Sequence, residues 1–497
     1  TPDPSRLAVL YLDAPAGDER LSHVGRGIAR DLIDALSDVP ALTVISDLEV
    51  RHVTSPAMNV DSIVRALGVG TIVHGSLEPQ GDSLRVLLRV SDASGTLRAA
   101  IPLLVQQGQV AGLHDEIASR VASALRRLVG AGVAARTWRA ATRSDSAWLL
   151  RQRAAERYQA GRDALISGAA RTGMLMIEQA DTMLALAAAL DRAWSDPIVA
   201  RGWIAAHRAV GQDSATQARW LTAGIQFADE ALTRSPGSAP ARELRGVQRY
   251  RLWRHVRHGR DAPLLALALA DLRAATLADP RRARAWTTMG QILNDRGDAQ
   301  GAAAAARAAM DADPYLVDVA PSVQLLVFSH LQAQRYDSAR TLCLDGVRRF
   351  PSAPELRACE LSVLGWAGRG RADATRAWTL LAREEAALGG PEGPALFPAG
   401  RAFAAAVLAR SGLTDSAHAV LGATRARLGR DSVGPRWLVY EAMVRTALGE
   451  RAPALTLLER AVASDVGLRP SIASLPWFVT LRGERRFIAL TEPSFSP

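Results

Sequence analysis

The feature that most restricts the fold of this chain is a pattern that recurs through its middle. Alanine-rich apolar segments end repeatedly at a proline or an arginine. These closing positions, spaced by 44, 44, 34 and 37 residues, are Arg192, Pro236, Pro280, Pro314 and Pro351. Such a period predicts stacked supersecondary units, because a single small unit cannot bury its apolar face alone. We therefore expect residues 131–470 to form an all-α solenoid of helical hairpins.

The stretch 285–314, AWTTMGQILNDRGDAQGAAAAARAAMDADP, shows how one unit would fold. Apolar residues at helical spacing predict a first helix, a turn follows at 294–298, and the second helix is almost all alanine. Gly290 lies inside the first helix, where glycine costs about 1 kcal/mol relative to alanine. A close approach by a neighbouring helix would explain this glycine. We predict that Gly290, like Gly202 and Gly246 in the preceding units, is wedged against an adjacent helix.

The units of the solenoid differ in length, and the last one is followed by a segment of a different kind. The 44-residue units depart from the 34-residue one, which predicts longer helices or longer loops. Residues 471–497 contain SLPWFVTLRGERRFIAL, which predicts a capping helix over the last apolar face of the array. The apolar residues of this cap are Trp477, Phe478, Leu481, Phe487 and Leu490.

The first 130 residues have a different periodicity, after an N-terminal tail at 1–6. The expected strands span 7–12, 41–46, 70–79, 83–92 and 97–105, and the expected helices span 23–37, 60–68 and 113–129. In the fourth strand Leu84, Val86, Leu88 and Val90 would face one side and Arg85 and Arg89 the other. The order β-α-β-α-β-β-β-α predicts that 7–130 form an α/β domain, a mixed sheet with helices packed on it.

Both regions resemble known families. Residues 145–465 resemble the tetratricopeptide repeat (TPR), most closely at Trp286, Gly290, Ala302, Ala309 and Pro314. Residues 7–130 resemble the TolB-like amino-terminal domain of bacteria. The stretches that carry this resemblance are LAVLYL, GIARDLIDALSDVPALTVIS, ALGVGTIVHGSLEPQGDSLRVLLRVSDASG and LHDEIASRVASAL. The resemblance implies a chain of the kind found after bacterial transmembrane serine/threonine kinases, adenylate cyclases or winged-helix regulators, although none of those partner domains is present here.

The residue types argue against catalysis. All 60 basic residues other than histidine are arginine, so a Walker A loop, a kinase strand lysine and Schiff-base chemistry are excluded. There is no HExxH, CxxC or GxSxG motif. His74 is interpreted as a turn or sheet-edge histidine, and Asp31 and Asp34 as a solvated helix face. We expect no enzyme activity, no cofactor and no metal.

The strongest charged feature is 241–260, ARELRGVQRYRLWRHVRHGR. Its predicted basic face consists of Arg251, Arg254, Arg257 and Arg260, with aromatic residues between them. Three interpretations stay open: a solvated helix face in a lysine-free chain, a surface for an acidic protein or anionic lipid, and a nucleic-acid site. The third is the weakest.

A binding groove is expected along the first helices of the hairpins. Residues one and four positions after each small residue would face into it. The predicted groove residues are Trp203, Val247, Tyr250, Gln291 and Asn294. They lack the lysine–arginine–asparagine pattern with which some TPR proteins grip a peptide carboxylate. Docking of a peptide or helix by aromatic and polar contacts is therefore the expectation.

Two further features concern the compartment. Cys343 and Cys359 lie on consecutive predicted helices and could form a disulfide in an oxidising compartment or remain two buried thiols. No apolar run reaches 18 residues, so no membrane span is expected. The first residue is Thr1, so we expect a chain that is processed, trimmed or part of a longer one.

The sequence thus predicts a non-enzymatic scaffold for protein partners, or a sensor arm in a membrane-associated complex. The resemblance to the TolB-like family implies a periplasmic location, free or membrane-anchored; the alternative is cytoplasmic. A second hypothesis is the small-molecule-sensing region of a receptor kinase or cyclase, in which the α/β domain binds the ligand. A third, weaker one is a nucleic-acid-binding regulator acting through 251–260.

Overall fold

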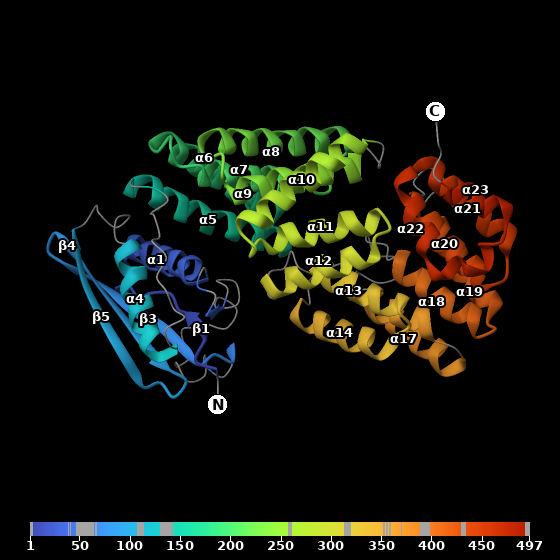
Figure 1. The fold of residues 1–497 in the computed structure, drawn as a ribbon, viewed down its shortest axis with the longest axis horizontal. Coiled ribbons are helices and arrows are strands. Elements are labelled where there is room, and N and C mark those ends of the chain that lie inside the picture. The colour runs from blue at the N-terminus through green and yellow to red at the C-terminus, as the bar shows by residue number, and fades with distance from the viewer. Residues whose placement is uncertain are drawn as a thin grey trace. The chain divides into compact units, whose positions relative to one another are not determined.

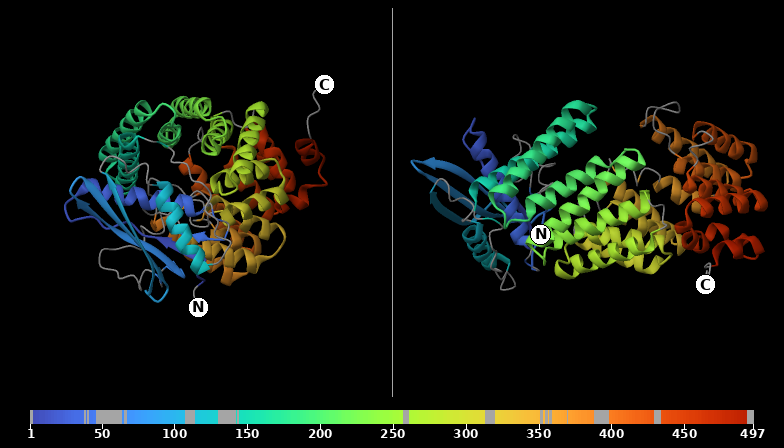
Figure 2. Two further views of the ribbon diagram at one scale, coloured as in Figure 1. Left: turned by 60° about the vertical axis from the view of Figure 1, so that its left-hand side comes forward. Right: turned by 90° about the horizontal axis from the view of Figure 1, so that it is seen from above.

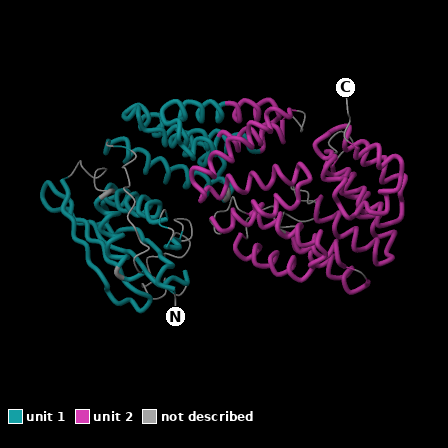
Figure 3. Tube along the Cα trace, viewed as in Figure 1, with its two compact units in different colours: residues 1–210, 223–244 teal, residues 211–222, 245–497 magenta. Residues whose placement is uncertain are grey.

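The computed structural model describes residues 3–37, 39, 41–45, 64, 67–106, 114–129, 142, 144–256, 261–312, 320–350, 353, 356, 359–368, 370–387, 398–428 and 434–492. The chain divides into two compact units (Figure 3). Unit 1 comprises residues 1–210 and 223–244, and unit 2 comprises residues 211–222 and 245–497. The division falls inside the helical region rather than after residue 130, because the first helical hairpin packs on the α/β domain.

Unit 1 begins with a five-stranded mixed sheet in the order β2-β1-β3-β4-β5. Its strands are β1 (Arg6–Val9), β2 (Thr43–Val44), β3 (Thr71–Gln80), β4 (Ser83–Asp92) and β5 (Leu97–Gln106). β1 pairs in parallel with β2 and β3, whereas β3, β4 and β5 are antiparallel. The helices α1 (Glu19–Ser37) and α4 (His114–Val129) pack against one face of the sheet (Figure 1).

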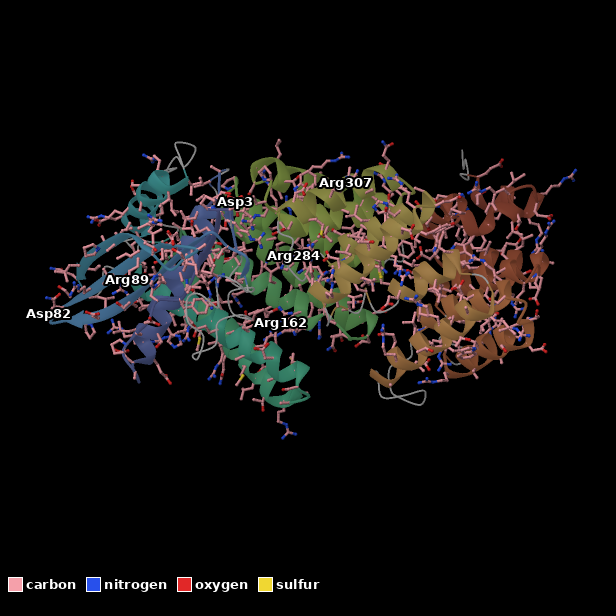
Figure 4. All side chains as sticks on the ribbon, turned by 90° about the horizontal axis from the view of Figure 1, so that it is seen from below. Asp3, Asp82, Arg89, Arg162, Arg284 and Arg307 are labelled. Atoms are coloured by element: carbon pink, nitrogen blue, oxygen red, sulfur yellow. A yellow bond between two sulfur atoms is a disulfide. The ribbon has the colours of Figure 1, made fainter. Side chains whose placement is uncertain are left out.

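The alternation predicted for β4 is confirmed. Its even-numbered apolar residues from 84 to 90 are buried against α1 and α4, while Arg85 is exposed on the other face. Gly81 supplies a left-handed turn with φ +60° between β3 and β4, and Asp82 lies at the tip of this hairpin (Figure 4). Pro102 lies within β5, the outermost strand described, where a residue without an N–H is tolerated.

The rest of the described chain is helical, so the predicted class, an α/β domain followed by a TPR-like solenoid, is confirmed. Antiparallel helices form successive hairpins (Figure 2). In chain order they are α5 (Asp145–Ile166) with α6 (Ala170–Leu190), α7 (Asp196–Arg208) with α8 (Ser214–Arg234), α9 (Ala239–Arg251) with α10 (Ala262–Ala278), α11 (Ala283–Asp295) with α12 (Ala299–Ala312), α13 (Ala320–Gln332) with α14 (Tyr336–Arg349), α16 (Cys359–Ala367) with α17 (Arg371–Ala387), α18 (Pro398–Arg410) with α19 (Thr414–Leu428), and α20 (Pro435–Ala447) with α21 (Arg451–Ser464).

The longer units are explained by longer helices. Helix α8 has 21 residues, against 14 in α12. Helix α9 continues into a π-helical turn, η2 (Leu252–Val256), before α10 begins. Helix lengthening, one of the two predicted explanations for the 44-residue spacing, is therefore present in both units.

The prediction about the three helical glycines is confirmed. A Cβ built on Gly202 would lie 2.3 Å from Leu244, and one on Gly246 would lie 2.7 Å from Leu272. The Gly290 position is looser, with Leu325 at 3.1 Å. The close neighbour of Gly202 lies on α9 of the next hairpin, whereas that of Gly246 lies on α10 of the same hairpin, and neither glycine leaves room for a side chain.

One described helix, α6, is long and apolar enough to cross a membrane by length and composition, although no uninterrupted run of 18 apolar residues exists. Its sequence contains Glu178 and Asp181. Ile177, Ala180 and Leu184 are buried between the neighbouring helices, and Asp181 is paired with Arg201 at 2.8 Å. These contacts place one face of α6 against its neighbours in the array, while Leu175, Leu186 and Leu190 on the helix are exposed.

Candidate binding cavity in unit 2

A cavity of about 250 Å³ opens in unit 2. First helices of the hairpins form most of it: α11, α13, α16, α18 and α20 each contribute at least one lining residue. The remaining wall comes from the segment that follows α21. This location matches the groove expected along the first helices.

Carboxamide side chains provide the neutral polar part of the lining. Gln291 and Asn294 extend from α11. Gln324, Phe328 and Gln332 follow at intervals of four residues on α13, which places them on one helix face. The four carboxamides are half-buried, and none makes a hydrogen bond or ion pair within the part of the chain that the structure describes. Their donors and acceptors are available to a ligand.

Aromatic rings form the apolar part of the lining: Phe328, Trp366, Phe403, Tyr440 and Trp477. The Trp366 and Trp477 rings meet edge to face with centroids 5.5 Å apart, and those of Phe403 and Tyr440 do so at 5.9 Å. The guanidinium of Arg410 lies 4.1 Å from the Trp477 ring centroid and donates to the Trp366 carbonyl oxygen at 3.1 Å. These contacts hold the rings in fixed orientations.

An ion pair closes one end of the polar row. Arg254, carried by the π-helical turn η2, donates to the Asp295 carboxylate and to the Tyr250 hydroxyl oxygen. Tyr250 Oη in turn donates to Asp295 Oδ2 at 2.8 Å. Because Tyr250 is buried and close to Asp295, its pKa lies well above the ordinary value. Burial also raises the pKa of Tyr440, against the opposing charge of Arg254, so both phenols stay neutral.

The charge of Arg254 is thus neutralised within the protein. Burial alone would lower the pKa of its guanidinium, but the interactions with Tyr250 and Asp295 outweigh burial and raise it. Arg436 is the other arginine in the lining, and its side chain is exposed. The interior of the cavity is therefore polar but has no uncompensated charge, and the exposed cation is that of Arg436.

The C-terminal segment forms the remaining wall. It folds as η4 (Val466–Leu468), α22 (Arg469–Ser474), η5 (Pro476–Leu481) and α23 (Arg485–Thr491). Its predicted capping residues are buried, so the cap is confirmed, but as several short helices rather than one. The same segment also returns to the turn between α11 and α12, where Pro470 lies 3.1 Å from a Cβ built on Gly297. The sequence predicted the cap and missed the wall, because no local pattern indicates a contact this distant in sequence.

Two of the five predicted groove residues line the cavity, and the other three lie elsewhere. Gln291 and Asn294 line the cavity. Trp203 is half-buried in unit 1, where it packs against the core formed by α7 and α8. Val247 and Tyr250 are only 2% and 3% exposed, so these two are corrected to core positions. The register was extrapolated from α11, but at α9 the hydrogen bond to Asp295 draws the Tyr250 hydroxyl inward.

The predicted basic face needs a similar correction. Arg254 is paired with Asp295, as described above. Earlier in the same stretch, Arg245 and Arg249 are both paired with the buried Asp271, at 2.6 and 2.5 Å. These arginines tie neighbouring helices together, and their charge is compensated. Arg251 is half-buried, and Arg257 and Arg260 lie outside the described residues.

The remaining candidates are also placed. Cys343 and Cys359 are buried and joined as a disulfide, with Cα atoms 5.8 Å apart.

His74 lies within the central strand β3 rather than at a turn or sheet edge, and its Nε2 is 3.2 Å from Ser91 Oγ. Burial, then the charge of Arg89, lowers the pKa of His74 despite the opposing effect of Asp13. Asp31 does not face solvent freely, because it accepts from Trp148 Nε1 at 2.8 Å.

No protein-family model matches the chain, and no curated protein matches it. Solved structures that resemble it are helical-repeat proteins. A TPR protein of Thermus thermophilus matches at 17% identity over 42% of this chain and 98% of that chain, with a TM-score of 0.32. A TPR protein of Parabacteroides merdae matches at 12% identity over 65% and 99%, with a TM-score of 0.30. The human IFIT1 dimer with PPP-AAAA matches at 13% identity over 77% and 83%, with a TM-score of 0.39. At such low identities and TM-scores these likenesses carry no argument about function.

Proposed function

We propose that the chain is a non-enzymatic binding scaffold whose recognition site is the cavity of unit 2. The observation that carries this proposal is the combination of ordered aromatic rings with four half-buried carboxamides that have no hydrogen-bond partner among the described residues. Polar groups in such positions are normally satisfied by protein or solvent. A ligand that brings its own donors and acceptors would satisfy them, and the rings would bury its apolar part.

A thermal-shift screen tests this assignment. The chain is challenged with a library of peptides and small polar compounds, and every hit is repeated on Phe328→Ala, which opens the aromatic lining. The matched control is Trp378→Ala, since Trp378 is 44% exposed on α17 and absent from the lining. Hits that stabilise the wild type and the control but not the cavity variant support the proposal. If every hit survives Phe328→Ala unchanged, this cavity is not the recognition site.

We further propose that the scaffold works as an extracytoplasmic arm, free or membrane-anchored, and passes ligand binding on to a protein partner in a membrane-associated complex. The resemblance to TolB-like chains suggests this context. The Cys343–Cys359 disulfide supports it, since structural disulfides persist in oxidising compartments. Alkylation with a maleimide reagent in freshly lysed cells provides the test: an unmodified chain is expected, and quantitative modification of both thiols after denaturation would place the chain in a reducing compartment.

A second candidate function is small-molecule sensing, favoured by the C-terminal segment that walls the cavity. In this version unit 2 binds the small molecule, in contrast to the expectation that the α/β domain does so. Nucleic-acid binding through 251–260 loses support, because Arg254 is already paired with Asp295. A gel shift at low salt tests it: a retarded band with random DNA or RNA would restore the hypothesis.

A further inference from the structure

We infer that the ligand of the unit 2 cavity is a saccharide. The part of it that enters the cavity would be an uncharged ring of the size of a pyranose. This inference rests on the proposed function and specifies the chemical class of the ligand. It follows from three properties of the lining: the balance of hydrogen-bond donors and acceptors, the aromatic surface, and the compensated interior charge.

The donor–acceptor balance matches hydroxyl groups. Each carboxamide offers two N–H donors and one acceptor oxygen, and a sugar hydroxyl is likewise both donor and acceptor. One carboxamide can therefore bind two neighbouring hydroxyls at once. The hydroxyls of Ser471 and Ser474 already donate to backbone carbonyl oxygens at 2.9 and 3.0 Å, so their oxygens remain as acceptors. Together with Gln291, Asn294, Gln324 and Gln332, the lining presents neutral groups of both kinds.

The apolar part matches the other face of a sugar ring. A pyranose exposes aliphatic C–H groups on its flat faces, and these pack well against aromatic rings. Five aromatic residues line the cavity, and the Trp366–Trp477 and Phe403–Tyr440 contacts fix four of them. A purely aliphatic ligand would leave the carboxamides unsatisfied, and an ion would find only Arg436 uncompensated.

The shape favours a compact ligand over a long peptide. An extended peptide needs a groove that is open along its length, whereas the C-terminal segment contacts the turn between α11 and α12 through Pro470 and Gly297. The volume of about 250 Å³ lies just below the usual range for small-molecule sites, ~300–1,000 Å³. A sugar ring is of this scale.

Isothermal titration tests the inference, with maltose and N-acetylglucosamine as probes. Arms with 3-phenylpropionate, 3-phenylpropylamine and the peptide hits of the thermal-shift screen identify other ligand classes. We expect saccharide binding that weakens about tenfold or more in the double variant Gln324→Leu with Gln332→Leu, since both side chains lose their hydrogen bonds to the sugar. Gln300→Leu is the matched control, because Gln300 is exposed on α12 outside the lining. Circular dichroism and the melting temperature verify that the variants are folded.

The outcomes separate this inference from the proposed function. Failure of both sugars to bind, while a charged, purely apolar or peptide ligand maps to the cavity, overturns the saccharide inference and leaves the binding scaffold standing. Equal weakening by Gln300→Leu also overturns it, because the carboxamides of the lining would then have no special role. If no compound of any class is sensitive to Phe328→Ala, the proposed function falls as well.

Discussion

At the scale of single residues, a glycine in a helix marks a close contact but does not reveal how close. Gly202, Gly246 and Gly290 occupy equivalent positions in successive units. The sequence match to the repeat is best around Gly290, yet the contact there is the loosest of the three. The reason is physical: sequence reports that a side chain is absent, whereas the available space depends on which side chain the neighbouring helix presents.

Substitution by alanine should therefore lower stability at Gly246 but not at Gly290. At Gly246 a Cβ would meet Leu272 Cγ at 2.7 Å and the Ala268 carbonyl oxygen at 3.0 Å, so overpacking should lower the free energy of unfolding by about 1–2 kcal/mol. At Gly290 the nearest atom is a flexible leucine methyl at 3.1 Å, so the gain in helix propensity should leave stability unchanged or raised by up to ~1 kcal/mol. The free energies of unfolding of Gly246→Ala and Gly290→Ala, measured by urea unfolding and compared with the wild type, test this prediction. Equal losses in both would contradict the packing described.

A second residue-scale prediction concerns pH. The pKa of Asp92 is lowered to about 2, mainly because its carboxylate accepts hydrogen bonds from Ser94, with a further contribution from Arg98. A lowered folded-state pKa stabilises the fold above the unfolded value of ~3.9, and this contribution is lost as pH falls towards 2. Wild type should therefore be more stable than Asp92→Asn at pH 5, with the two converging near pH 2. Melting temperatures that differ by the same amount at both pH values would show that the carboxylate charge is not the cause.

At the scale of elements, the hairpin turns within the described part of the chain share a left-handed residue. It is glycine in most of them: Gly168, Gly211, Gly297, Gly370, Gly412 and Gly449 all have positive φ. Between α13 and α14 the position is held by Gln334, the only described non-glycine residue with positive φ, at 57°. This spacing of turn glycines is visible in the sequence and would have located the hairpins more evenly than the closing prolines.

Gln334→Gly should stabilise unit 2. A side chain in the left-handed region costs ~1–2 kcal/mol, part of which is offset because glycine also frees the unfolded chain. We expect a net gain of about 0.5–1 kcal/mol in the free energy of unfolding. Ala333→Gly, one residue earlier at the end of the same helix, is the control and should gain nothing. Destabilisation by Gln334→Gly would mean that the glutamine side chain makes contacts worth more than the backbone strain.

At the scale of the whole molecule, the compact units do not follow the change of periodicity in the sequence. Helix α5 belongs to the repeat region, yet it packs on α1 of the α/β domain. Trp148 on α5 is buried against Gly27 and donates to Asp31 at 2.8 Å, and Arg26 is paired with Glu156 at 2.7 Å. The α/β domain and the first hairpin are therefore joined through a specific interface.

Trp148→Ala should loosen this joint. Removing a buried tryptophan typically costs ~3–5 kcal/mol, and here the loss falls on the interface between α1 and α5. In scanning calorimetry we expect a lower-temperature transition for unit 1, separated from that of unit 2. Trp378→Ala, which removes an exposed tryptophan, should change neither transition noticeably. A single unshifted transition in Trp148→Ala would contradict the role given to this interface.

These scales also show how far the sequence could predict the molecule. Local patterns predicted the strands, the hairpins and the burial of the cap, since each depends on residues near in sequence. Two cavity residues, Gln291 and Asn294, were found by extrapolating the repeat. Gln324, Gln332 and the rings were missed, because they converge only through stacking. The pairing of Arg254 with Asp295 was missed for the same reason: the two are 41 residues apart.

The wall contributed by α22 and η5 changes how the end of this chain should be handled in the laboratory. A terminal cap covers the last apolar face of a repeat array and need not take part in binding. Here, removal of the residues after α21 would also delete Ser471, Leu475 and Trp477 from the cavity. A shortened chain that stayed folded would still have lost one side of its proposed recognition site.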